Sequence, residues 1–374
     1  MIKQVNLIDI CDPKQWKTIS SNDLHDEGYP VYGANGKIGY FSKYTHEFPT
    51  VLITCRGATC GTINICEPKS YVNGNAMALD NLDSSVDLTY LFYVLKYRGF
   101  DDAISGSAQP QITRQNLKNV KIPMPLLVNQ RKIAAILDAA DSLRQKDQQL
   151  VERYTALSQS LFLEMFGDPV TNQHGFEKGK IRDLISSANY GTSAKAQEGG
   201  MYPYLRMNNI TYQGEMDFRS LKFINLVESD KPKYLVKKGD VLFNRTNSKE
   251  LVGKTAIYNE KAEMAIAGYL IRLRVNERAN PYFIWGCLNS KHGKTTLAHM
   301  CKSIVGMANI NAQEVQNIES VLPPVSLQNQ FAERIQLIEA QKQQAQLSLA
   351  KSEAVFNSLL QRAFTGELTA KMAA

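Results

Sequence analysis

Polar side chains of the kinds that contact nucleic acids gather in glycine- and asparagine-rich stretches of the chain. Arginine matches the edge of guanine, asparagine and glutamine match adenine, and threonine, serine and lysine can hold phosphates. The stretches lie at 32–37, 54–59, 69–75, 190–195, 205–209 and 243–249. The candidate DNA-binding residues are Tyr32, Asn35, Lys37, Arg56, Thr59, Lys69, Asn73, Tyr190, Thr192, Ser193, Lys195, Arg206, Asn208, Asn209, Arg245, Thr246, Asn247 and Lys249.

The same residue types also form turns, because Asn, Gly and Ser stabilise turns without any ligand. For a single stretch, a turn is therefore the better interpretation. Similar stretches occur in both halves of the chain, and this recurrence favours binding.

No set of residues predicts catalysis. Gly253-Lys254-Thr255 resembles the end of a phosphate-binding loop, but that loop requires glycine where this chain has Ser248. Asn280-Pro281-Tyr282-Phe283 lacks one proline of the Asn-Pro-Pro-Tyr motif of adenine methyltransferases, and no glycine-rich methyl-donor site accompanies it. The histidines form no metal pair, and Cys55, Cys60 and Cys66 have the wrong spacing for a zinc knuckle. We expect a binding protein with no catalytic residues, metal or cofactor of its own.

The positive charge of the chain is concentrated in its second half. Residues 175–302 contain 21 Lys and Arg against 12 Asp and Glu, a balance of +9, whereas residues 1–122 contain 12 of each. A locally basic domain favours a polyanionic partner such as nucleic acid, although a basic surface that only confers solubility would have the same composition.

The elements that must position these stretches follow from an internal repeat. Residues recur 200 positions apart in the pairs Gly106 and Gly306, Ala108 and Ala308, Pro123 and Pro323, and Gln130 and Gln330. A long segment with heptad periodicity follows each copy. The chain is therefore interpreted as two halves.

The heptad segments predict two long helices. In the first segment, one row contains Ile133, Ala140, Tyr154 and Leu161, with Asp147 as a break, and a second, unbroken row contains Ile136, Leu143, Leu150 and Leu157. In the second segment the apolar positions are Phe331, Ile335, Ile338, Ala345, Leu349, Phe356, Leu359 and Ala363, interrupted by Lys342 and Ser352. The simplest partner for each helix is the other one.

We therefore predict an α+β fold in which two sheet-rich domains are separated by two long helices, packed as an antiparallel coiled coil with a pseudo-twofold repeat. Short strand-like runs include 50–54 and 61–65 in the first domain and 240–244 and 268–275 in the second. The predicted limits are 1–125 for the first domain, 126–166 for the central helix, 167–324 for the second domain, and 325–374 for the C-terminal helix and tail. No export or membrane segment is visible, so we expect a cytoplasmic protein.

Over essentially its whole length the chain resembles the specificity subunit of type I restriction-modification systems. The resemblance is carried by the repeated Gly-x-Ala, Pro and Gln unit with its heptads, by 327–331, and by the terminal stretch 358–368. Residues 30–36 and 239–248 are also similar to parts of known target-recognition domains. The second copy of the repeat has Asn309-Ile310 where the first has Gln109-Pro110.

The resemblance implies two target-recognition domains, each reading one half of a bipartite, asymmetric site in double-stranded DNA. It also implies that the helices bind two modification subunits, which carry S-adenosylmethionine and methylate adenine N6, and through them the restriction subunits. The main alternative is a self-contained DNA methyltransferase or nuclease with fused recognition domains, which would need a methyl-donor or metal site. A scaffold that binds only protein is a further alternative.

Overall fold

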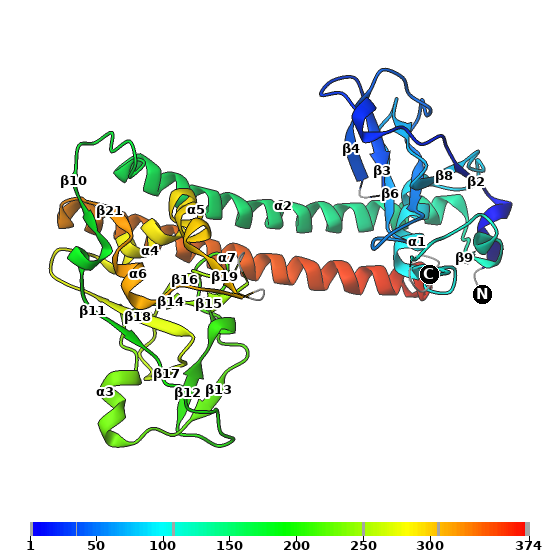
Figure 1. Cartoon of the computed structure of the whole chain (residues 1–374). Helices are drawn as coiled ribbons and strands as arrows, with labels where there is room; N and C mark the ends of the chain where they lie inside the picture. The colour runs from blue at the N-terminus through cyan, green and yellow to red at the C-terminus, as the bar shows by residue number, and fades with distance from the viewer. Residues whose placement is uncertain (1–2, 35, 107–108, 249–250, 305–306, 371–374) are drawn as a thin grey trace. The chain divides into compact units, whose positions relative to one another are not determined.

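The computed structural model describes residues 3–34, 36–106, 109–248, 251–304 and 307–370. It divides into two compact units: unit 1 comprises Met1–Gln148 and Leu347–Ala374, and unit 2 comprises Gln149–Gln346. Each unit contains part of both long helices, α2 (Leu127–Phe166) and α7 (Val325–Phe364) (Figure 1). The predicted α+β class and the two long helices are confirmed.

Unit 1 contains two small β-sheets. The four-stranded sheet has the order β2-β8-β5-β6, with β2 at Asp12–Gln15, β8 at Ala76–Asp80, β5 at Val51–Thr54 and β6 at Ile63–Ile65. The three-stranded sheet has the order β4-β3-β7, with β4 at Gly36–Phe41, β3 at Tyr29–Gly33 and β7 at Tyr71–Val72. Strands β3 and β7 are parallel, so their carboxyl ends lie at the same edge of the sheet.

Unit 2 repeats this arrangement strand for strand. Its four-stranded sheet has the order β11-β18-β14-β16, with β11 at Ile185–Tyr190, β18 at Leu270–Val275, β14 at Val241–Asn244 and β16 at Thr255–Ile257. Its three-stranded sheet has the order β13-β12-β17, with β13 at Lys222–Ile224, β12 at Tyr202–Leu205 and β17 at Ala265–Ile266. Strands β12 and β17 are parallel, like β3 and β7.

Further elements complete each unit. Unit 1 has the pair β1 (Gln4–Asn6) and β9 (Lys121–Pro123), helix α1 (Leu88–Arg98), and the short helices η1 (Leu7–Asp9), η2 (Ser21–Asp23), η3 (Asn116–Asn119) and α8 (Glu367–Ala370). Unit 2 has the pair β10 (Glu177–Lys180) and β21 (Glu319–Leu322), the strands β15 (Thr246–Asn247), β19 (Lys302–Ile304) and β20 (Met307–Asn309), and helices α3 (Lys231–Tyr234), α4 (Pro281–Asn289), α5 (Lys291–Met300), α6 (Ala312–Gln316), η4 (Ile181–Leu184), η5 (Met207–Asn209) and η6 (Glu228–Asp230).

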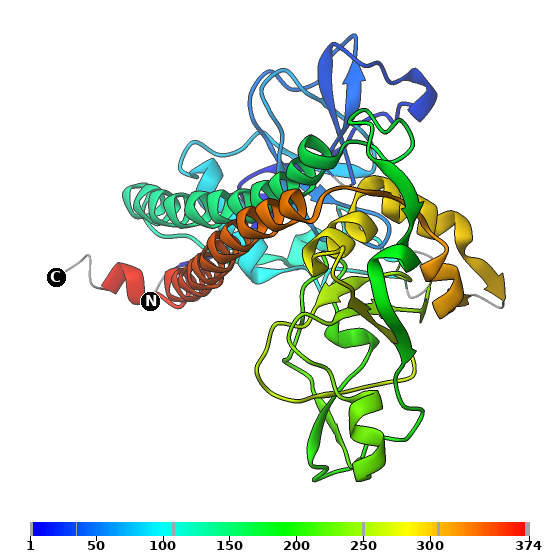
Figure 2. The same ribbon diagram turned by 90° about the vertical axis from the view of Figure 1, so that its left-hand side faces the viewer.

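Within each unit the two long helices lie side by side (Figures 1 and 2). In unit 1 the first part of α2 and the last part of α7 share one hydrophobic core, which contains Ile133, Leu137 and Phe356. In unit 2 the last part of α2 meets the first part of α7, where the rings of Phe166 and Phe331 are 5.2 Å apart. Because the beginning of each helix pairs with the end of the other, the helices are antiparallel.

For α2, burial is confirmed at residues of the first predicted row and is wrong for the leucines of the second. Ile133 and Leu161 of the first row are buried, but Leu143, Leu150 and Leu157 of the unbroken second row are 53%, 40% and 48% exposed. The row that packs contains Leu137 and Ser158, each one residue further along the helix. Polar residues interrupt this packed row, and the uninterrupted leucines suggested the wrong face. In α7 the predicted register is confirmed.

A buried glutamine near the start of each long helix joins it to its own unit. The Gln130 side chain accepts from Asp87 N at 2.8 Å and donates to the carbonyls of Ser85 and Pro125. In unit 2 the equivalent residue is Gln328, which accepts from Asn280 N at 2.8 Å and donates to the carbonyls of Arg278 and Pro323. Gln130 therefore matches Gln328 rather than Gln330.

We expect Gln328→Ala to lower the free energy of unfolding by about 2–4 kcal/mol, because several buried backbone groups would lose their partner together. Gln330→Ala is the matched control: its side chain is exposed, so the loss should be under about 0.5 kcal/mol. Urea denaturation followed by circular dichroism measures both. Equal losses for the two variants would contradict the assignment of Gln328.

Candidate nucleic-acid interface

In unit 1, polar loops meet where β3, β5 and β7 end. Thr54 Oγ1 donates to Ala34 O at 2.6 Å, and Asn73 N donates to Tyr32 O at 2.8 Å. Cys55 N donates to Asn75 O at 3.0 Å. The loops that follow these three strands, which lie far apart in the sequence, therefore form one edge, called here the polar edge of unit 1.

The predicted residues contribute differently to this edge. Arg56 and Thr59 are exposed, and Lys37 lies 4.5 Å from the centre of the Tyr40 ring, where hydrogen bonding to Tyr40 raises the pKa of the ammonium. Tyr32 is buried and donates to Glu67 at 3.1 Å.

Three other predicted residues of unit 1 fall outside this pattern. Asn73 is buried, with its amide bound to Ile19 O and Gly74 N. Lys69 precedes β7, with its ammonium 4.0 Å from Glu47, and so lies at the opposite end of that strand from the polar edge. Asn35 lies outside the described residues.

Unit 2 has a polar edge at the equivalent position, where β11, β12, β14 and β17 end. Thr192 N donates to Ile266 O at 2.9 Å, Ala267 N donates to Leu205 O at 2.9 Å, and Arg245 N donates to Tyr269 O at 3.0 Å. The predicted stretches at 190–195, 205–209 and 243–248 therefore lie together. Lys249 is outside the described residues.

Arg245 and Tyr190 form a pair at this edge. The guanidinium carbon lies 4.8 Å from the centre of the Tyr190 ring, and the Tyr190 hydroxyl accepts from Ala312 N at 2.8 Å. The ring limits the orientations of the guanidinium. Thr246 Oγ1 donates to Asn309 Oδ1 at 3.1 Å, and Asn247 accepts from Ser248 N at 2.9 Å.

The remaining predicted residues of unit 2 divide into exposed and structural ones. Asn208, Ser193 and Lys195 are exposed. Thr192 is buried, and its hydroxyl accepts from Ala194 N at 3.1 Å. The amide of Asn209 is buried and fully engaged in its own loop, where it accepts from Arg206 N at 2.9 Å and donates to Asp217 O at 2.7 Å.

Sequence reasoning did not include Gln111 and Asn309 among the candidates. Ile112 N donates to Cys55 O and Ile310 N donates to Arg245 O, so Gln111 and Asn309 border the two polar edges at equivalent places. Both side chains are exposed. The signal was present, because both residues belong to the internal repeat.

Two lysines lie beneath the polar edge of unit 2. Lys254 Nζ donates to the carbonyls of Met207 at 2.7 Å and Ile210 at 2.5 Å, and so braces the loop that carries Asn208. Gly253-Lys254-Thr255 is therefore a structural turn. Burial lowers the pKa of Lys254, and burial together with the charge of Lys254 lowers the pKa of Lys294 to about 8.

Two further observations bear on the expectations from the sequence. Cys55 and Cys66 are buried in the sheets of unit 1, where burial raises the pKa of both thiols. Among the described helices, none has the length and apolarity that crossing a bilayer requires.

The architecture matches a known fold. The chain superimposes on the crystal structure of a type I restriction-modification S subunit from M. genitalium with a TM-score of 0.66 and 17% identity, covering 97% of this chain and 96% of that one. The family model described as "Type I restriction modification DNA specificity domain" matches residues 2–153 and 173–348. Because the family model matches most of the chain, the chain belongs to that family.

Proteins similar in sequence are also specificity subunits of type I restriction enzymes. The chain is 26% identical over 296 residues to the EcoKI specificity subunit of Escherichia coli strain K12, covering 74% of this chain and 64% of that protein. It is 23% identical over 378 residues to the StySPI specificity subunit of Salmonella potsdam, covering 94% and 77%. The match thus spans slightly less than two thirds of the Escherichia coli protein.

The burial of Lys294 predicts a pH-dependent stability. Below pH 8 the folded protein holds this ammonium in an unfavourable site, so Lys294→Met should stabilise it by about 1–2 kcal/mol at pH 7. Between the lowered pKa near 8 and the ordinary value of 10.5, the unfolded chain binds more protons, so wild-type stability rises with pH and the difference shrinks.

Urea denaturation at pH 7, 8.5 and 10 measures this difference. Lys291→Met, at an exposed position one turn earlier on α5, is the control and should change little at any pH. A stabilisation by Lys294→Met that stayed constant from pH 7 to pH 10 would contradict the burial of the charge.

Proposed function

We propose that this chain is the DNA specificity subunit of a type I restriction-modification complex and reads a bipartite, asymmetric DNA site, one half through each polar edge. One observation carries the proposal: a single strand framework occurs twice and presents different exposed side chains at the equivalent edge. Two equivalent strand frameworks that carry different side chains can read two different half-sites, as an asymmetric DNA site requires. In this proposal the recognition domains comprise residues 1–125 and 167–324, and the helical segments comprise 126–166 and 325–374.

Arginines are the strongest candidates for base reading in both units. Arg245 is held against Tyr190 and has a planar fork that can donate two hydrogen bonds to guanine. Arg56 is exposed at the equivalent edge of unit 1, where it pairs with Gln111 as Thr246 pairs with Asn309 in unit 2. Lys37, Thr59, Ser193 and Lys195 are suited to phosphates, and Asn208, Asn247, Gln111 and Asn309 to adenine or phosphate.

The buried candidates have a supporting role in this proposal. Tyr32, Asn73, Thr192 and Asn209 shape the loops from inside. Thr246 and Arg206 are only partly buried: Thr246 holds Asn309, and Arg206 donates to Ser220 O at 3.1 Å at the base of its loop and stays a candidate for contact with DNA. Lys69 would bind phosphate only on DNA that extends beyond the polar edge of unit 1. Asn35 and Lys249 remain candidates from the sequence.

The helices supply a surface for the partners. Leu143, Leu150 and Leu157 recur every seven residues along α2 and remain exposed, and an exposed apolar row of this kind marks a protein interface. We assign it to a modification subunit, which carries S-adenosylmethionine and methylates adenine, and the internal repeat supports two such subunits. Restriction subunits would join through them, and the complex would act on cytoplasmic DNA.

We expect Arg245→Ala and Arg56→Ala to relax base discrimination in different half-sites, by about 5- to 150-fold each, the range of one good bidentate contact. Lys195→Ala, a phosphate control, should weaken binding to all sequences alike and reduce the salt dependence by about one unit of slope. Methylation rates of the assembled complex, on duplexes with single base-pair changes, measure the discrimination.

Mapping of methylated adenines in cells with and without the gene identifies the site beforehand. Loss of the gene should abolish methylation at one bipartite sequence. Relaxation of the same half-site by both arginine variants would argue against one half-site per unit, and an unchanged methylation map would argue against the function as a whole.

For the partner surface, Leu150→Asp should abolish co-purification with the modification subunit while leaving the thermal unfolding temperature within about 2 °C of wild type, since the side chain is already partly in water. Gln149→Asp adds the same charge at the neighbouring exposed position and serves as the control. Co-purification of the Leu150→Asp variant at the wild-type level would exclude this row as the docking surface.

A further inference from the structure

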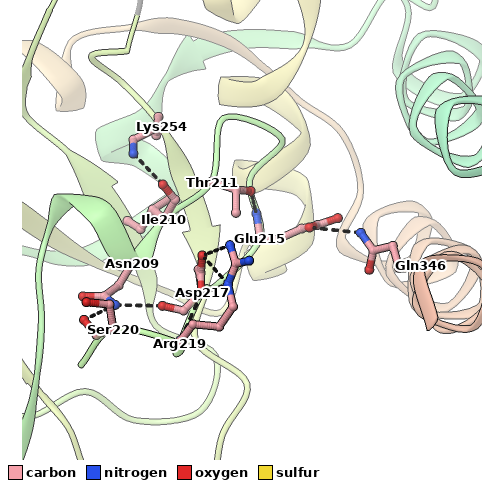
Figure 3. A network of polar contacts seen from close by, with 9 residues as sticks. All are labelled: Asn209, Ile210, Thr211, Glu215, Asp217, Arg219, Ser220, Lys254 and Gln346. Carbon is pink, nitrogen blue, oxygen red and sulfur yellow. Dashed lines mark hydrogen bonds and ion pairs between the residues drawn. The ribbon is translucent and has the colours of Figure 1, made fainter. Parts of the chain in front are cut away.

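The loop between β12 and β13 has a base that reaches the polar edge of unit 2 and a tip that points elsewhere. The loop folds back on itself: Thr211 N donates to Glu215 O at 2.9 Å, and Asp217 N donates to Asn209 O at 2.8 Å. Figure 3 shows Asn209 at the base, next to Ser220, and Glu215 at the tip, facing Gln346 of α7. The loop therefore spans from the polar edge to the long helix.

The tip is anchored to the helices of unit 2. Glu215 Oε1 is 2.5 Å from Lys342 Nζ of α7, and Gln346 Nε2 donates to Glu215 Oε2 at 3.5 Å. Trp285 Nε1 of α4 donates to Gly214 O at 2.9 Å. Gly214 has φ +86°, and a Cβ atom there would lie 2.7 Å from Thr255 O, so this close approach requires glycine.

Burial makes the ion pair between Glu215 and Lys342 unusual. The Lys342 side chain is only 4% exposed, whereas Glu215 is 29% exposed. Moving an ammonium out of water costs several kcal/mol, and an apolar residue at such a position is often at least as stabilising as the ion pair. Stability alone therefore does not explain a lysine in the apolar row of α7.

The other half of the repeat offers a comparison. Helices α2 and α7 both have 40 residues, and Arg144 of α2 occupies the position equivalent to Lys342. Arg144 binds Asp141 of its own helix at 2.7 Å. In unit 1 the cation at this position bonds within its own helix. In unit 2 the charge of Lys342 also acts on Glu339 of its own helix, but its ion pair is with Glu215, in a loop of the sheet domain.

We infer that Glu215 and Lys342 are positioning residues for sequence reading by unit 2. Their ion pair fixes the tip of the loop to α7, and the hydrogen bonds of Asn209 carry this constraint to Arg206 and Asn208 at the base. Arg206 and Asn208 are thereby held in one orientation toward DNA, so that base discrimination depends on a residue in the helical seam. The inference rests on the proposed function.

The test replaces the ion pair with uncharged residues. The double variant Glu215→Gln, Lys342→Met keeps the volume of both side chains. Burial raises the pKa of the neighbouring Glu339 and the charge of Lys342 opposes this rise, so without Lys342 the Glu339 carboxyl takes up a proton more readily. In the methylation assay, discrimination should fall by about 3- to 30-fold in the half-site read by unit 2, which is the half-site that Arg245→Ala alters. Discrimination in the other half-site should change less than twofold, and thermal unfolding should report an intact fold.

Two controls separate positioning from general stability. Asp141→Asn with Arg144→Met removes the equivalent ion pair of unit 1 and should leave discrimination in both half-sites within about twofold. Lys342→Arg preserves the charge with the residue found at the equivalent position, and should retain most of the discrimination even if the double variant unfolds.

The outcomes are distinguishable. The inference is overturned if the double variant discriminates as well as wild type, if both half-sites relax equally, or if Lys342→Arg discriminates as poorly as the double variant. If the wild-type complex itself methylates no bipartite site, the proposed function fails instead.

Discussion

Each long helix has to bury one continuous seam in two separate hydrophobic cores, and the rest of the structure depends on this requirement. A helix of 40 residues is about 60 Å long, more than one small core can cover. Helix α2 buries Ile133 and Leu137 in the core of unit 1, and Leu161 and Phe162 in the core of unit 2. Helix α7 does the same in the opposite order. Two cores are therefore needed, and the internal duplication provides one core of the same architecture in each unit.

The duplication preserves what is buried and leaves the edges free to differ. The buried glutamines Gln130 and Gln328 make the same three kinds of hydrogen bond, and the sheets have the same strand order. At the polar edges, by contrast, the loops are joined mainly through backbone groups, as between Arg245 N and Tyr269 O. Backbone bonds do not depend on the side chain. The exposed residues can therefore change at little cost to the fold.

The sequence predicted the α+β class, both long helices and their mutual packing, because heptad periodicity over 40 residues is a strong local signal. The predicted packing face of α2 was wrong where polar residues occupy the packed positions. Ser158 lies in the seam of α2, while the unbroken leucines at 143, 150 and 157 are exposed. The partner of Gln130 was likewise misplaced, since Gln328 and Gln330 fit a sequence pattern equally well and only the hydrogen bonds distinguish them.

The candidate site could be predicted as a set of stretches but not residue by residue. Each cluster could be placed next to a predicted strand, but the meeting of the clusters at 32–37 and 54–59 could not be derived from sequence, because β3 and β5 belong to different sheets. Whether an asparagine points outward cannot be derived in this way, because the same residue type caps turns and reads bases. Asn208 is exposed and Asn209, its neighbour, is buried with both ends of its amide engaged.

Polar residues in the helical seam show how the two levels of the structure are connected. A seam made only of leucine and isoleucine would hold the helices together but would allow them to slide by a heptad, whereas Asp147 accepts from Ser348 at 3.1 Å in one register only. Lys342 adds a second constraint, because its partner Glu215 belongs to a loop of the sheet domain. Apolar packing thus supplies the affinity between helices, and the few buried polar contacts determine how each helix is aligned with its partner and with the surface that it supports.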